Sequence, residues 1–146
     1  MKQPLFDDEV FFSEYKNLRE RPDSFNTLLE QPAFFELLPP LKGLSVLDLG
    51  CGFGDACRQY VRLGAESVVG IDVAEKMLAE ARNLTDSPKI QYQIMNLDEI
   101  TGLEGPFDLI VSSLAIHYVR DFQKLAESVW MRLAEGGLFI FSQEHP

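Results

Sequence analysis

The stretch VLDLGCGFG, residues 46–54, decides how this chain folds. A short aliphatic run ends in three glycines at every second position, and a segment compatible with a helix follows at once. Glycines at such a turn let the backbone reverse sharply and let a ligand approach it without meeting a Cβ atom. The next aliphatic run ends at Asp72, where an acidic side chain can accept hydrogen bonds from ribose hydroxyls in an α/β fold. The pattern predicts a site for a nucleoside cofactor.

The glycine spacing and the local charge narrow the choice of cofactor. The dinucleotide fingerprint is Gly-x-Gly-x-x-Gly, with a pyrophosphate resting on the helix N-terminus. Here the third glycine, Gly54, comes one residue early, and Asp55 holds the last position. A carboxylate beside a pyrophosphate would be repelled by roughly 1 to 4 kcal/mol, and Asp48 adds a second carboxylate just before the glycines. S-adenosylmethionine carries a cationic amino group and a sulfonium but no phosphate, so these acidic residues favour it over NAD.

Residues 44–142 resemble a class I S-adenosylmethionine-dependent methyltransferase, in the broad group that acts on small molecules. The resemblance rests on four motifs in the expected order: VLDLGCGFG at 46–54, IDVAEKML at 71–78, FDLIVSSL at 107–114 and LAEGGLFI at 133–140. In the last motif the family usually has Pro-Gly-Gly, where this chain has Glu-Gly-Gly. The resemblance implies a Rossmann-like fold, S-adenosylmethionine as methyl donor, S-adenosylhomocysteine as product and a small-molecule methyl acceptor.

The resemblance also implies a set of cofactor-binding residues. In the family, the acidic residue of the second motif, here Asp72, holds the ribose, and the methionine, here Met77, flanks the adenine. Asn96 stands where the family usually has an acidic residue that reads the adenine amino group, and its side-chain carbonyl can still accept that hydrogen bond. The cofactor-binding positions expected in and around the motifs are Asp48, Gly50, Cys51, Gly52, Asp72, Val73, Met77, Asn96, Leu97 and Ser113.

Three of the polar candidates have two interpretations each. Tyr15 and Arg19 are four residues apart and share a face if their segment is helical. A Tyr hydroxyl and a guanidinium would then clamp the methionine carboxylate of the cofactor, and the alternative is a solvated N-terminal helix. Asp48 is either an electrostatic partner of the methionine amino group or a strand-end residue that hydrogen-bonds the turn.

His117 is the candidate catalytic base. It follows the predicted fourth strand, and open α/β sheets bind ligands at the carboxyl ends of their strands. Histidine is also the usual general base near neutral pH. The alternative is a packing role in the wall of the donor pocket. Methyl transfer depends mainly on orientation and the exclusion of water, so the sequence carries no strong catalytic signature and does not identify the acceptor.

Composition excludes several other classes of function. The chain has 146 residues, 46% of them hydrophobic, which suffices for one domain with a real core. Its net charge is −10 and its basic residues are scattered, so nucleic acid is not expected as a partner. We find neither a membrane-length apolar run nor a secretory signal, and expect no membrane partner. Cys51 and Cys57 have neither metal-ligand nor disulfide-framework spacing, so we expect no metal site and a cytoplasmic location.

The chain is predicted to form one domain in two parts. Residues 1–43, rich in aromatic side chains, are expected to form a helical lid over the cofactor crevice, and residues 44–146 the cofactor-binding core. Alternating patterns predict a doubly wound, Rossmann-like parallel sheet of about five strands with helices on both faces. The strands are predicted at about 44–49, 67–72, 89–94, 106–111 and 137–142, and the helices near 54–64, 74–84 and 121–133.

Other interpretations of the same sequence remain open. It ends directly after the fifth predicted strand, whereas the family usually continues with two antiparallel strands. This keeps open a non-catalytic domain that binds S-adenosylmethionine or serves regulation. An NAD(P)-dependent oxidoreductase is a further alternative, which Gly54 and Asp55 disfavour. The apolar fifth strand also predicts a homodimer through its edge, or a cover from another part of the molecule.

Overall fold

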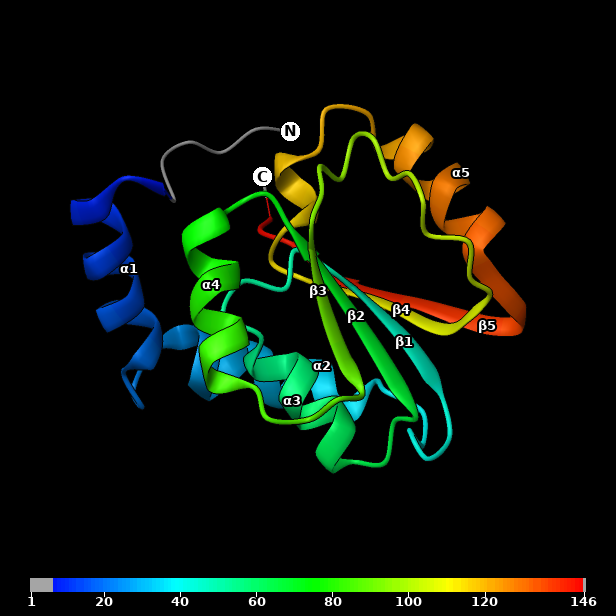
Figure 1. Ribbon diagram of the computed structural model, residues 1–146, viewed down its shortest axis with the longest axis horizontal. Helices are drawn as coiled ribbons and strands as arrows, with labels where there is room; N and C mark the ends of the chain where they lie inside the picture. Colours follow the sequence, from blue (N-terminus) through cyan, green and yellow to red (C-terminus); the bar gives the residue numbers. More distant parts are fainter. Residues whose placement is uncertain (1–6, 146) are drawn as a thin grey trace.

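A computed structural model describes residues 7–145 of the chain and contains one sheet of five parallel strands (Figure 1). The order across the sheet is β3-β2-β1-β4-β5, so the chain starts in the middle and winds outward in both directions. This confirms the predicted α/β architecture. The strands are β1 (Ser45–Leu49), β2 (Ser67–Asp72), β3 (Ile90–Ile94), β4 (Phe107–Ser113) and β5 (Leu133–Ser142).

Local capping chemistry marks the start of some of the helices. Asp121 accepts a hydrogen bond from the Lys124 backbone N–H at 3.1 Å and starts the last helix. Ser24 accepts from the Thr27 N–H at 3.2 Å, and Pro32 lies in the first turn of the helix that follows. The helical elements are α1 (Glu9–Glu20), the π-turn η2 (Asn26–Glu30), α2 (Gln31–Glu36), α3 (Asp55–Arg62), α4 (Glu75–Leu84), the 3₁₀ turn η3 (Ile116–Tyr118) and α5 (Phe122–Arg132).

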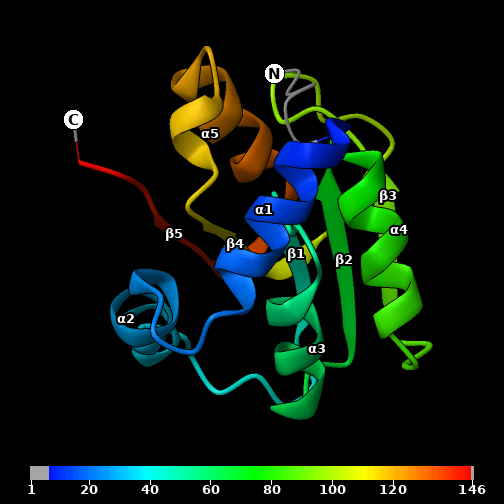
Figure 2. The same cartoon turned by 90° about the vertical axis from the view of Figure 1, so that its left-hand side faces the viewer.

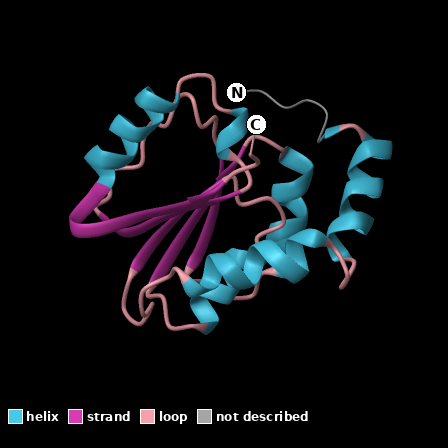
Figure 3. Ribbon diagram, turned by 180° about the vertical axis from the view of Figure 1, so that it is seen from behind, coloured by secondary structure: helices cyan, strands magenta, loops and turns pink. Residues whose placement is uncertain are grey.

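The two faces of the sheet are covered differently (Figure 3). Successive strand residues point to opposite faces, so Val46 and Leu47 enter two separate hydrophobic clusters. The Val46 cluster includes side chains from α2, α3 and α4. The Leu47 cluster includes Leu125 and Val129 of α5 together with side chains from the loop after β3. That loop contains no helix in residues 95–106.

β5 differs from its predicted extent. It begins at Leu133, whereas the sequence predicted a start near 137. The reason is a bulge: Phe107 pairs with Leu133, but Leu109 pairs with Leu138, so the intervening residues of β5 have no one-to-one partners on β4. Gly136, which has a φ of +77°, lies in that bulge. The pair Gly136-Gly137, which suggests a turn before the strand, therefore lies inside it.

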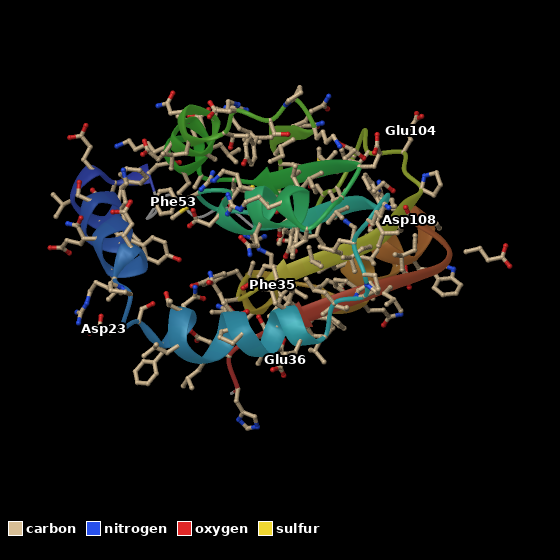
Figure 4. The ribbon with its side chains drawn as sticks, turned by 90° about the horizontal axis from the view of Figure 1, so that it is seen from below. Asp23, Phe35, Glu36, Phe53, Glu104 and Asp108 are labelled. Carbon is tan, nitrogen blue, oxygen red and sulfur yellow. The ribbon has the colours of Figure 1, made fainter. Side chains whose placement is uncertain are left out.

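The amino end of the sheet is fastened by a side chain far from the glycine turn. The Asp108 carboxylate accepts hydrogen bonds from the Ser45 backbone N–H at 2.9 Å and from the Ser45 hydroxyl at 3.1 Å. These bonds join the starts of β1 and β4. Figure 4 shows Asp108 and Phe53 toward opposite ends of the sheet.

The N-terminal helices take two different positions. α2 is part of the core, because Phe34 is buried in the Val46 cluster. α1 lies on the side toward which the strands' carboxyl ends point, next to α4 (Figures 1 and 2). Lys16 of α1 is paired with Glu80 of α4 at 2.8 Å. No helix in the described part of the chain is both long enough and apolar enough to cross a bilayer.

Candidate functional site

A pocket opens at the carboxyl ends of β1, β2 and β4, where the strand order reverses direction. Such a switch point is where open α/β sheets place their ligands. The pocket holds about 950 Å³ of free space, counting its open mouth. It brings together nine of the residues predicted from the sequence: Tyr15, Asp48, Gly50, Cys51, Gly52, Asp72, Val73, Met77 and Ser113.

Gly50 and Gly52 of the glycine turn lack a side chain for different reasons. Gly50 has a φ of +80°, and a Cβ added to it would lie 2.5 Å from the Ala115 Cβ, so packing inside the protein requires glycine there. Gly52 has a φ of +53°, and the nearest atom to an added Cβ would be the Met77 sulfur at 4.0 Å. Gly52 therefore leaves open space beside the pocket, which an approaching ligand can use.

Asp72 supports this turn from the end of β2. One carboxylate oxygen accepts from the Gly52 N–H at 2.9 Å, and the other accepts from the Ala74 N–H at 3.0 Å. Burial raises the pKa of Asp72, and these backbone hydrogen bonds oppose the rise. A carboxylate has about four acceptor sites, and the backbone N–H groups of Gly52, Val73 and Ala74 use up to three of them, which leaves at least one for a ligand. Asp72 can thus hold the loop and accept from a ligand hydroxyl at the same time.

Asp48 is a buried carboxyl group at the floor of the pocket. Burial raises its pKa to about 7, while the Cys57 thiol, which donates to it at 3.3 Å, opposes that rise. Cys57 and Cys51 are free thiols, and both are buried. A carboxyl group held in this way binds a proton readily and gains most from a cation placed beside it.

Aromatic side chains from α1 and from the glycine turn, Tyr15 and Phe53, line part of the pocket. Phe53 lies between Phe12 and Tyr15, with ring centroids 5.6 and 6.4 Å away. These contacts join α1 to the loop that follows β1. Tyr15 faces the pocket, and its segment is helical as the clamp hypothesis required. The Arg19 side chain lies outside the described residues, so its part in that clamp remains a prediction.

Three predicted residues do not line the pocket. Asn96 and Leu97 follow β3, and the Asn96 side-chain carbonyl accepts from the Asp98 backbone N–H at 2.9 Å. His117 lies in η3, with its ring 4.3 Å from that of Tyr118. Its Nδ1 is shielded from solvent and has no hydrogen-bond partner among the described atoms of the chain. The roles expected for these residues remain predictions.

The pocket also contains residues that sequence reasoning missed. Glu30, Tyr60 and Tyr118 line it, alongside Phe34 and Phe35 of α2. Glu30 lies in the π-turn, for which the sequence shows no distinctive pattern. A signal was present for the phenylalanines, because the N-terminal aromatic density indicated packing over the crevice.

The charged side chains in the described lining of the pocket are all acidic. Its lining, as far as the chain is described, includes Glu30, Asp48, Asp55 and Asp72 but no lysine, arginine or histidine. Asp55 is paired with Arg58 just outside. The other three carboxyl groups have no cationic partner among the side chains that the structure describes, which do not include that of Arg19. This environment attracts cations and repels phosphates and carboxylates.

Known proteins resemble the chain over most of its length. Residues 46–137 match the family described as methyltransferase domain. An uncharacterized protein of Haemophilus influenzae is 38% identical, over 99% of this chain and 59% of that protein. The mitochondrial ubiquinone biosynthesis O-methyltransferase of Rattus norvegicus is 36% identical, over 69% of this chain and 31% of that enzyme.

A solved structure agrees with these matches. The crystal structure of an S-adenosylmethionine dependent methyltransferase from Mesorhizobium loti is 46% identical, with a TM-score of 0.77. The match covers 80% of this chain and 54% of that one. The chain thus spans less than two thirds of the length of each of these relatives.

Proposed function

The chain belongs to the class I S-adenosylmethionine-dependent methyltransferases, and from this premise we propose that it transfers a methyl group from S-adenosylmethionine to a small-molecule acceptor. The observation that carries the proposal is the composition of the pocket. Gly52, Asp72 and Asp48 meet around one space whose described lining holds no cation. A donor that is positively charged and lacks phosphate matches that space.

Each part of the donor has a counterpart among these residues. Asp72 would accept from the ribose hydroxyls, with Met77 beside the adenine. Asp48 would face the methionine amino group, and Gly52 would allow close approach of the backbone. When bound, S-adenosylmethionine supplies an electrophilic methyl group on its sulfonium. The protein's own contribution is to orient the donor and acceptor and to exclude water.

Two observations favour a small molecule as the acceptor: the negative charge of the protein and the name of a relative. The net charge of −10 and the one-sided acidity of the pocket oppose a nucleic-acid substrate. The relative from Rattus norvegicus is named for an O-methyltransferase of ubiquinone biosynthesis. We extend to this chain only its use of a small-molecule acceptor. The two buried thiols suit a reducing compartment such as the cytoplasm.

The cofactor assignment is tested by titration calorimetry. We expect S-adenosylmethionine and S-adenosylhomocysteine to bind and NADH to bind negligibly. Preferential binding of NADH would overturn the proposal. Release of S-adenosylhomocysteine in the presence of an acceptor panel separates an enzyme from a non-catalytic binding domain, since such a domain binds the cofactor without turnover.

Replacing Asp72 tests the ribose contact. We expect Asp72→Ala to weaken S-adenosylhomocysteine binding by about 1–3 kcal/mol, the usual effect of losing hydrogen bonds to a charged group. Lys42→Ala, an exposed change away from the pocket, serves as the control for handling and folding. An unchanged affinity for the Asp72 variant would remove that residue from the site.

A further inference from the structure

Glu30 is a carboxyl group that reaches the pocket from the N-terminal part of the chain. Its Oε1 atom accepts hydrogen bonds from the hydroxyls of Ser113 and Ser142, both at 2.7 Å. Ser113 ends β4 and Ser142 ends β5. One side chain from η2 thus joins the carboxyl ends of two neighbouring strands, beside the space proposed for the methyl donor.

The other carboxylate oxygen of Glu30, Oε2, takes no part in these hydrogen bonds. Oε2 is shielded from solvent and has no hydrogen-bond partner among the described residues. Burying a carboxylate oxygen without a donor is unfavourable, so such an atom in a folded protein calls for an explanation. A ligand that brings an N–H or O–H to Oε2 removes the penalty.

The backbone around Glu30 has the character of a functional element. Glu30 is the last residue of the π-turn η2, and α2 follows without interruption. π-turns within helical segments cluster at functional sites. On the same segment, Gln31, Phe34 and Phe35 also line the pocket. The segment therefore offers one acidic group next to two aromatic rings.

We propose that Glu30 is the acceptor-binding residue, and that it selects an acceptor whose methylated atom carries a proton, an amine or a hydroxyl and not a carboxylate. This inference rests on the proposed function, because it assigns the second substrate of the same site. The pocket position of Glu30, its two serine anchors and its unpartnered oxygen support it.

The chemistry of transfer gives Oε2 a second use. As the acceptor nitrogen or oxygen forms its bond to the methyl carbon, the carbon–sulfur bond breaks and its electron pair stays on sulfur. The proton of the acceptor atom must leave, and we expect Oε2, which has no donor of its own, to receive it. Glu30 would give this proton up to water once the products leave and the pocket opens to solvent. The serine hydroxyls keep the carboxylate oriented throughout. Glu30 thus both positions the acceptor and takes its proton.

The test uses three probes with one phenyl scaffold: 2-phenylethylamine, 2-phenylethanol and phenylacetate. Binding of each to the full protein, saturated with S-adenosylhomocysteine, is followed by NMR titration. We expect the amine and the alcohol to bind at least tenfold more tightly than phenylacetate. Glu30→Gln should reduce this difference to threefold or less while leaving the affinity for S-adenosylhomocysteine within twofold.

Glu36→Gln is the matched control, because Glu36 lies on the same helical segment, is exposed and does not line the pocket. Figure 4 shows it on the outer side of α2, whereas Phe35 faces the sheet. The control should keep the wild-type ranking of the three probes. Equal binding of the three probes to the wild type would overturn the inference even where Glu30→Gln does not fold. A ranking retained in Glu30→Gln would overturn it as well.

The outcome also separates this inference from the proposed function. Loss of S-adenosylhomocysteine binding in the wild type contradicts the proposed function before any probe is added. Normal cofactor binding with no probe binding, or with phenylacetate preferred, contradicts only the role of Glu30. A fall in cofactor affinity in Glu30→Gln, with the probe ranking unchanged, would assign Glu30 to the donor instead.

Discussion

Individual residues in the pocket combine support of the fold with proposed contacts to the ligand, and Asp48 illustrates the conflict between the two. Burial raises its pKa from an ordinary value near 4 to about 7. The folded state therefore holds the proton more tightly than the unfolded chain does. The stability from this group is complete below about pH 4 and is lost as the pH rises through 7. Above that pH the fold contains a buried charge without a cationic partner in the described residues.

Because the folded state raises the pKa of Asp48, replacing this residue by asparagine should increase stability at high pH and decrease affinity for the cofactor. At pH 8, Asp48→Asn should raise the free energy of unfolding, by up to about 4 kcal/mol for a shift of three units. At pH 4 the effect should be small, because the folded carboxyl is already neutral. Affinity for S-adenosylhomocysteine should fall, because the amide cannot attract the amino group. Urea unfolding at both pH values and calorimetry check this. Higher stability with unchanged affinity would reduce Asp48 to a structural residue.

The two glycines of the turn give a second prediction at this scale. Gly50→Ala should lower the free energy of unfolding by about 2–4 kcal/mol, from contact with Ala115 and the strained φ. Gly52→Ala should cost only about 1–2 kcal/mol, because the space beside it is open. It should nevertheless weaken S-adenosylhomocysteine binding at least tenfold. Urea unfolding and calorimetry separate the two, and equal losses of stability would refute the distinction.

The secondary-structure elements differ in how far the sequence determines them. β2 was predicted over residues 67–72 and has those bounds, because its aliphatic run is buried on both faces. α5 was predicted within a residue at each end, since Asp121 caps it. The π-turn and the bulge in β5 depend on packing across the molecule, which no local pattern encodes. For that reason Glu30 escaped sequence reasoning, whereas Asp72, at the end of a plain strand, did not.

α1 is the element for which we propose movement. It contacts Phe53 through two aromatic rings and α4 through the Lys16–Glu80 pair. If residues 1–43 act as a lid, amide exchange across residues 8–30 should slow when S-adenosylhomocysteine is added. Residues 122–132 of α5, on the other face of the sheet, are the internal control. Identical exchange in both states would show that the segment only packs against the core.

At the scale of the whole molecule, β5 forms one of the two edges of the sheet, and part of its apolar surface is exposed. Its strand partner is β4, and none of residues 7–145 pairs with its other side. Leu138 and Phe141 are 46% and 38% exposed there. An exposed apolar edge favours pairing between chains. We therefore propose a homodimer through this edge for residues 1–146.

The dimer prediction is checked by light scattering after gel filtration. Leu138→Glu together with Phe141→Glu should shift the population toward monomer, because charges on an edge oppose pairing. Leu84→Glu, an exposed change on α4, is the control and should leave the mass unchanged. A monomeric wild type at every concentration tested would contradict the prediction.

The hydrogen bonds between Asp108 and Ser45 bear on which parts of the chain tolerate substitutions. They fasten the amino ends of β1 and β4, whereas the pocket is built at the carboxyl ends of the strands. Substitutions at the first place alter only how well the sheet holds together, whereas substitutions at the second, such as those at Asp48 and Gly50, alter both stability and binding. A library selected for thermal resistance without loss of turnover would therefore accumulate changes mainly at the amino ends of the strands. New acceptors could then be evolved at one end while the other keeps the scaffold intact.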